Sequence, residues 1–200
     1  MEAGNESYSH RLIGIAILEN MLQAENRLSK KAFLLGCVEP DYNFITYFRG
    51  SVKHDTLRGH NYENSFECMR RISDKLIGKR VWGAIEYYRL GKLIHYILDA
   101  FTYPHNGIFS GSIMEHREYE RVLEPKFNSM IMYFDWNIQY NNILNIIDFI
   151  DRYHSDYLKE KPGIDNDINY SLNAAASAAA ALLPCRRTVM GGYALIVNKT

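Results

Sequence analysis

Apolar residues recur at helical spacing through most of the chain, and no long stretch alternates strictly between apolar and polar positions. The helical spacing extends over residues 9–26, 29–41, 64–79, 81–103, 113–134, 142–159 and 168–184. A short run at 192–198, GYALIVN, is the one candidate strand. Neither an internal repeat nor a linker divides the chain. The pattern therefore predicts an all-α fold, a single-domain bundle of about seven helices over residues 1–200.

Capping residues and helix breakers predict where several of these helices begin and end. Ser9 is a candidate N-cap of the first helix. Gly36 and Pro40 are expected to end the second. The segment 81–103 is apolar on most sides towards its C-terminal half, so we expect it at the centre of the bundle. Residues 42–62 show no helical period and predict a long structured loop, a kind of segment that often carries function.

Composition and charge narrow the class of protein. Of the 200 residues 47% are hydrophobic, and the formal net charge is zero with histidine neutral. That balance argues against a long nucleic-acid substrate, because such binding relies on many Lys and Arg contacts. The three cysteines are far apart and form no CxxC pair, so neither a disulfide framework nor a thiolate zinc site is indicated.

No apolar run approaches the roughly 18–20 residues of a transmembrane helix. The first ten residues, MEAGNESYSH, lack the basic and apolar regions of a signal peptide, which predicts a cytoplasmic location. A chain trimmed of an export signal would begin in the same way, so a secreted origin stays open.

Side chains that bind metals gather in and after the central helix. Five nitrogen or oxygen donors fall within 26 residues: His95, Asp99, His105, His116 and Glu120. The first two and the last two are each four residues apart, which places each pair on one face of a helix. Pro104 is expected to end the central helix just before the third donor. Further donors lie upstream, at His10, Asp41, His54 and His60.

A metal site explains these residues better than core packing does. A buried carboxylate such as Asp99 costs several kcal/mol unless it is paired or bound to a metal. A hydrogen bond within the core would account for one His–Asp pair, but less simply for two pairs linked by a Pro–His turn. Imidazole with carboxylate is a donor set that suits zinc, and hydrolytic zinc sites keep one position open for water.

The stretch HYILDAFTYPHN resembles the HYxxDxxxPxH signature of the bacterial zinc-dependent phospholipase C family, whose fold is shared with the single-strand-specific zinc nucleases of fungi and plants. Its histidines and aspartate keep the signature's spacing, and its proline falls one position later. SHRLIGIAILENML, with His10, resembles the family's first core helix. Asp41 and His54 match its loop donors, and HREYE its H-x-x-x-E pair. The resemblance covers roughly residues 7–125 and implies a multi-helix fold of that type.

The resemblance implies two or three zinc ions. The ligands of one would be Asp41, His54, His95 and Asp99. Those of a second would be His105, His116 and Glu120. His10 and Asp99 would share in a third, which makes Asp99 a bridging carboxylate.

One family feature is missing from the start of the chain. In secreted members an N-terminal tryptophan completes the third zinc site, and this chain begins at Met1 without a tryptophan there. That site would be empty or completed by Glu2, Glu6 or Met1. His60 is the alternative to His54 as a ligand.

The resemblance implies a zinc-dependent phosphoric ester hydrolase, phospholipase C-like, that uses metal-activated water on a phosphodiester. Asp41 would be both ligand and general base. The expected partner is a phosphate-ester substrate, with phospholipids among the candidates. Three alternatives remain: a zinc-dependent nuclease or nucleotidase, a non-catalytic metal-binding helical module, and a helical interaction protein that uses the alanine-rich run 174–183. No feature of the sequence predicts the oligomeric state.

Overall fold

The computed structural model of the chain describes residues 6–22, 26–42, 61–137 and 145–183. Within these ranges the chain forms α-helices, one short 3₁₀ turn and no strand, which confirms the predicted all-α class. The elements are α1 (Glu6–Asn20), α2 (Arg27–Tyr42), α4 (Tyr62–Leu76), α5 (Ala84–Ala100), η1 (Tyr103–His105), α6 (Ile113–Ile131), α7 (Ile146–Tyr157) and α8 (Ile164–Leu182). None of these helices combines the length and apolarity that a bilayer span requires. The candidate strand at 192–198 lies outside the described residues.

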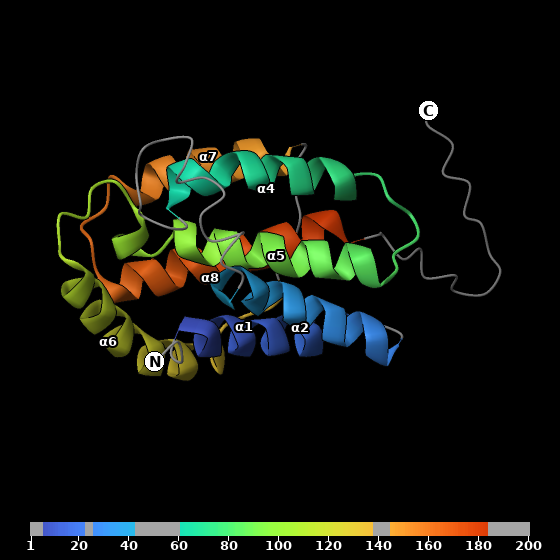
Figure 1. Cartoon of the computed structure of the whole chain (residues 1–200), viewed down its shortest axis with the longest axis horizontal. Helices are drawn as coiled ribbons and strands as arrows, with labels where there is room; N and C mark the ends of the chain where they lie inside the picture. Colours follow the sequence, from blue (N-terminus) through green and yellow to red (C-terminus); the bar gives the residue numbers. More distant parts are fainter. Residues whose placement is uncertain (1–5, 23–25, 43–60, 138–144, 184–200) are drawn as a thin grey trace, which may run out of the picture.

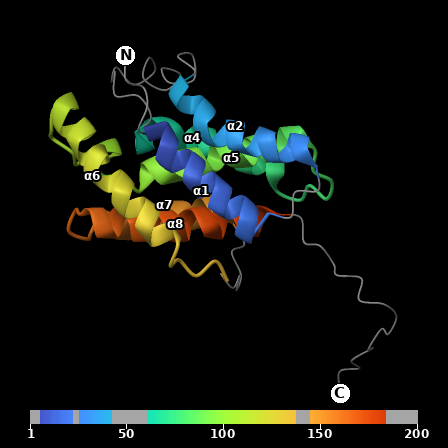
Figure 2. The same cartoon turned by 90° about the horizontal axis from the view of Figure 1, so that it is seen from below.

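Helix α5 is central, as its apolar pattern predicts. It packs against α1, α2, α4 and α8. Figure 1 shows α4 and α7 along one side of α5 and α1 with α2 along the other. Helix α6 crosses one end of the bundle, where it contacts α1 and α8 (Figure 2). Every α5 residue from Leu93 to Ala100 is buried, so the polar members of that run must find partners inside the protein.

Helices α2 and α5 touch backbone to backbone at two glycines. A Cβ atom at Gly91 would lie 2.1 Å from the Phe33 carbonyl oxygen, and one at Gly36 would lie 2.2 Å from the Tyr88 carbonyl oxygen. The prediction that Gly36 and Pro40 end the second helix is wrong, because α2 continues through both to Tyr42. Gly36 is needed for the close helix crossing, not for a helix end.

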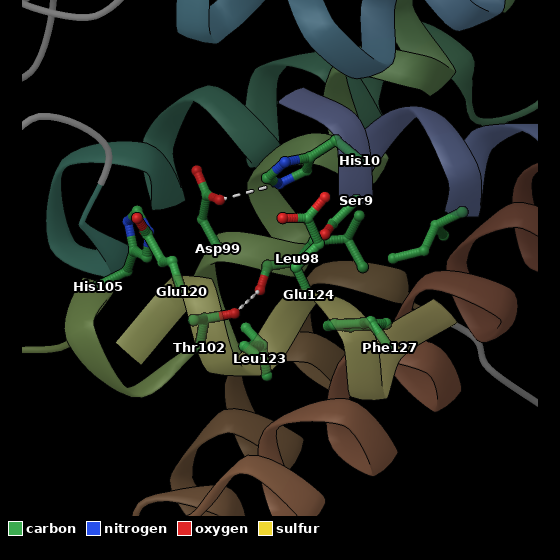
Figure 3. A pocket seen from close by; sticks show the side chains of 11 residues that line it. Ser9, His10, Leu98, Asp99, Thr102, His105, Glu120, Leu123, Glu124 and Phe127 are labelled. Atoms are coloured by element: carbon green, nitrogen blue, oxygen red, sulfur yellow. Dashed lines mark hydrogen bonds and ion pairs between the residues drawn. The ribbon is translucent and has the colours of Figure 1, made fainter. Parts of the chain in front are cut away.

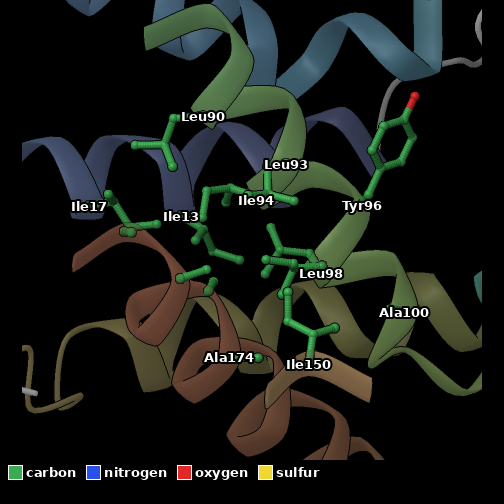
Figure 4. Packing of buried hydrophobic residues seen from close by; sticks show 14 of the residues in the cluster. Ile13, Ile17, Leu90, Leu93, Ile94, Tyr96, Leu98, Ala100, Ile150 and Ala174 are labelled. Atoms are coloured by element: carbon green, nitrogen blue, oxygen red, sulfur yellow. The ribbon is translucent and has the colours of Figure 1, made fainter. Parts of the chain in front are cut away.

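The hydrophobic core forms around α5, where aliphatic side chains of α1, α7 and α8 meet it. Figure 4 shows this packing, with Ile13, Leu93 and Ile150 among its members. The alanine-rich run lines the α8 side and is almost fully buried at Ala174, Ala175, Ala176, Ala178 and Ala179. Such small side chains let α8 approach α5 closely. The buried face of this run is therefore occupied by packing within the bundle.

Several helix ends differ from the predictions. Ser9 lies inside α1, which begins at Glu6, so its expected role as N-cap is wrong. Helix α8 begins at Ile164, four residues earlier than expected. Helix α4 is capped by Asn61, whose Oδ1 accepts a hydrogen bond from the Asn64 backbone N–H at 2.9 Å. The cap of α4 is a local hydrogen bond, which apolar periodicity does not reveal.

Candidate metal centre

The first group of predicted ligands comes together from three helices. His10 belongs to α1, Asp41 to the last turn of α2, and His95 with Asp99 to α5. One donor atom each from His10, Asp41 and His95 lies within 4.8 Å of the other two. Asp99 lies between the two histidines. Its Oδ1 is 3.0 Å from His10 Nε2, and its Oδ2 is 3.2 Å from His95 Nε2.

Asp41 completes this first group. Its Oδ1 lies 3.4 Å from His95 Nε2, and its Oδ2 lies 4.0 Å from His10 Nδ1. The two imidazole rings stack with centroids 4.2 Å apart. Each histidine therefore has one carboxylate from α2 and one from α5 within about 4 Å, so that one cation could contact donors from more than one helix.

The second group joins the η1 turn to α6. His105, His116 and Glu120 place one donor atom each within 4.8 Å of one another. Glu120 Oε1 lies 2.5 Å from His116 Nε2 and 3.3 Å from His105 Nε2.

A capping box fixes where α6 begins and so aligns this pair. The Glu115 carboxylate accepts from the Ser112 backbone N–H at 2.7 Å, and the Ser112 hydroxyl accepts from the Glu115 backbone N–H.

Asn106 holds the turn that carries His105. Its side-chain amide donates to the carbonyl oxygens of Ala100 and Thr102, at 3.1 and 2.8 Å. Its Oδ1 lies 2.7 Å from Nε2 of the buried His154. Burial lowers the pKa of His154 to about 4, while the nearby Asp151 carboxylate and the Ala100 carbonyl oppose this shift. The last residue of the HYILDAFTYPHN stretch is thus a structural support for the turn.

The first group fits a bound cation. Asp41 Oδ2 and Asp99 Oδ2 are buried and accept no hydrogen bond from the part of the chain that the structure describes. His95 Nδ1 donates to the Cys37 carbonyl at 2.9 Å, which orients the ring so that its Nε2 faces both carboxylates. Such an arrangement of acceptors is unfavourable without a positive charge between them. Histidine nitrogens and carboxylate oxygens are donors that zinc accepts.

Asp99 is held in its ionised form. Burial raises its pKa, but electrostatic interactions with His95 and His105 and the hydrogen bond from His10 lower it by more, so that the pKa lies well below its usual range. An ionised carboxylate is the form that binds metals. Because His105 belongs to the second group and lowers the pKa of Asp99, the two groups lie close enough to interact electrostatically.

Both groups open onto one pocket. Figure 3 shows His10 and Asp99 of the first group and His105 and Glu120 of the second directed towards it. The pocket spans about 440 Å³, including space open to solvent. Its lining residues are Ser9, His10, Ile13, Leu98, Asp99, Thr102, His105, Glu120, Leu123, Glu124 and Phe127. The donors thus form a polar end beside an apolar wall from α1, α5 and α6.

The family model for zinc-dependent phospholipase C matches residues 9–164. The chain belongs to the zinc-dependent phospholipase C family. This confirms the family resemblance based on HYILDAFTYPHN. The match spans both donor groups, and the family's description names a zinc-dependent phospholipase C, which is a hydrolase. No curated protein and no solved structure gives a significant match to the chain.

Not every predicted residue can be placed in this zinc-dependent phospholipase C fold. The predicted ligand His54 and its alternative His60 lie outside the described residues, as do Met1 and Glu2.

Sequence reasoning also missed residues that the structure brings to the site. Glu124, whose pKa is raised by burial, lines the pocket one helical turn after Glu120, a spacing that could have identified it. The supporting role of Asn106 depends on contacts between distant segments and has no signal of this kind.

Proposed function

We propose that this protein is a zinc-dependent phosphoric ester hydrolase of the phospholipase C type, which cleaves a phosphodiester with water. One observation carries the proposal: two groups of histidine and carboxylate donors open onto a single pocket that has an apolar wall. Membership of a zinc-dependent hydrolase family supports the same reaction class. Each group could hold a metal ion, and we propose that the two groups together bind two or three, the number that the family resemblance implies.

The ligands we propose are those that the two groups contain. His10, Asp41, His95 and Asp99 would bind one or two ions, with Asp99 as the bridging carboxylate and His54 as a further ligand. His105, His116 and Glu120 would bind another. Zinc bound at these positions would lower the pKa of water towards neutrality and would place positive charge beside the phosphate.

Asp41 is the residue that we propose as general base. Its Oδ2 is buried and accepts no hydrogen bond from the described residues, so this atom could take the proton that the attacking water loses. Its Oδ1 faces His95, which leaves the two oxygens with different surroundings. Substitution by Asn would keep the size of the side chain and remove both the base and an anionic ligand.

The shape of the pocket favours a phospholipid as substrate. The apolar wall beside the polar end consists of Ile13, Leu98, Leu123 and Phe127. A phosphodiester whose alcohol is diacylglycerol would place its phosphate at the donors and its apolar part along that wall. The zero net charge of the chain supports a small ester over a long nucleic acid.

Hydrolysis assays on four substrates would test this function. We would compare a p-nitrophenyl phosphodiester, a short-chain phosphatidylcholine, single-stranded DNA and a nucleoside monophosphate, with the protein loaded with zinc or treated with chelator. We expect zinc-dependent release of diacylglycerol from the phospholipid. Glu120→Gln should lose most activity, whereas Glu118→Gln should retain it, because Glu118 is exposed on the same helix and pairs with Arg121.

Two results would contradict the proposal. Preferential cleavage of DNA or of the nucleotide would favour the nuclease or nucleotidase alternative. Stoichiometric zinc without hydrolysis of any of the four esters would favour a non-catalytic metal-binding module.

A further inference from the structure

Asp167 of α8 is a fully buried carboxylate that lies outside both donor groups. Three donors surround it. Its Oδ2 accepts from the backbone N–H of Tyr103 and from the hydroxyl of Tyr119, each at 2.8 Å. Its Oδ1 accepts from the hydroxyl of Tyr157, also at 2.8 Å. One side chain of α8 thus binds to η1, α6 and α7 at once.

Stability alone gives little reason for a carboxylate at this position. A buried ionised group costs several kcal/mol, and well-packed apolar side chains are often as stable or more so. Burial raises the pKa of Asp167, and the bonds from Tyr103, Tyr119 and Tyr157 oppose this shift only in part. The cost of burying the charge suggests a role in fixing geometry.

Two of the three donor residues lie within two positions in the sequence of a proposed ligand of the second group. Tyr103 stands two residues before His105, and Tyr119 immediately precedes Glu120. Both bonds end on the same oxygen, so the Oδ2 atom ties the turn that carries His105 to the helix that carries Glu120. The covalent link between these elements runs through residues 106–112, which include two glycines. Without Asp167, the glycine-containing connection would leave the ligands less well fixed.

We propose that Asp167 is a positioning residue for zinc binding by His105, His116 and Glu120. It holds η1 and α6 at the separation at which their side chains converge, so that less conformational freedom is lost when the ion binds. This inference rests on the zinc site of the proposed function, but not on the identity of the substrate or on catalysis.

Zinc affinity in matched tyrosine variants would test the role. Tyr119→Phe removes the bond between Asp167 and α6, and Tyr157→Phe removes an equivalent bond to the same carboxylate from α7, which carries no ligand. Asp167→Asn weakens all three. Competition of the zinc-free proteins with a chromophoric chelator, at a temperature where each variant is folded, would give the affinity of each site.

We expect Tyr119→Phe and Asp167→Asn to weaken one zinc site by about 10–100-fold, the usual effect of losing a supporting contact. The other zinc and the Tyr157→Phe protein should stay close to the wild type. In a Glu120→Gln background, where the second group is already disabled, Tyr119→Phe should change nothing further.

An unchanged zinc affinity in Tyr119→Phe would overturn the role of Asp167, and so would equal weakening in Tyr157→Phe. If Asp167→Asn does not fold, the two tyrosine variants still decide. A wild-type protein that binds no zinc at the second group would overturn the proposed function and this inference together, whereas normal wild-type binding with an unaffected Tyr119→Phe overturns this inference alone.

Discussion

The crossing of α2 and α5 makes a strong prediction for Gly91→Ala. In an exposed helix this change stabilises a protein by about 1 kcal/mol, because alanine has the higher helix propensity. Here the new Cβ would lie 2.1 Å from the Phe33 carbonyl oxygen, and ordinary contact begins at 3.4 Å. The helices would therefore have to separate by roughly 1.3 Å at this point.

The clash involves backbone atoms, which cannot rotate away as a side chain can. Overpacking a core costs about 1–3 kcal/mol, and a rigid neighbour places Gly91→Ala at the upper end. After the gain in propensity, we expect a net loss of about 2 kcal/mol or more in the free energy of unfolding. For a chain of this size, 2 kcal/mol corresponds to a melting temperature lower by about 4–8 °C.

The same displacement should affect the metal centre. The Cys37 carbonyl on α2 accepts from His95 Nδ1, and Asp41 on α2 faces His95 across the crossing. Separation of the helices would lengthen both contacts, so zinc binding by the first group should weaken as well.

Thermal unfolding in chelator and zinc titration would measure the two effects of Gly91→Ala. Gly14→Ala is the matched control, because its Cβ would meet only side-chain atoms of Cys37 and Leu34, at 3.0 and 3.1 Å. We expect the control to stay within about 1 kcal/mol of the wild type. A Gly91→Ala protein as stable as the wild type would refute the close packing of the two helices.

Three further predictions concern the turn and the metals. Because burial lowers the pKa of His154 from 6.5 to about 4, only the unfolded chain takes up its proton in that range, so the wild type should lose up to about 3 kcal/mol as the pH falls. His154→Gln should remove this component, and a wild-type-minus-variant difference that is constant from about pH 7 to 4.5 in chelator would contradict it. Asn106→Ala should cost about 2–4 kcal/mol in chemical denaturation and weaken zinc binding through His105, since it removes two hydrogen bonds to backbone carbonyls and the partner of His154 Nε2; an unaltered unfolding midpoint would exclude that support. Free zinc at about 100 times its dissociation constant should stabilise the wild type by about 2.7 kcal/mol, seen as a higher melting temperature, and should stabilise Glu120→Gln less; equal stabilisation of both would argue against Glu120 as a ligand.

Local patterns in the sequence predict the central helix and the two helical pairs of candidate donors. The apolar run of α5 requires burial on all sides, and the four-residue spacing of His95–Asp99 and His116–Glu120 places each pair on one helix face. Glu124 follows Glu120 by the same spacing, so it could have been found in the same way.

The supports of the site could not be predicted, because they join segments far apart in the chain. The bond from His95 Nδ1 to the Cys37 carbonyl spans 58 positions, and the one from Tyr119 to Asp167 spans 48. The prediction that Gly36 ends a helix fails for a related reason. The contact that requires glycine there is with the Tyr88 carbonyl oxygen of the neighbouring helix. A single sequence shows which residues can pack or bind, but not which distant partner each one meets.

Metal content tests the central claim, a multi-zinc site bridged by Asp99, most directly. Wild-type protein purified without chelator, Asp99→Asn and the surface control Glu118→Gln would be analysed for zinc per chain. We predict two or three ions in the wild type and in the control, and at least one fewer in Asp99→Asn, because Asp99 lies between His10 and His95 in the first group. An Asp99→Asn protein with the zinc content of the wild type would contradict the bridging role.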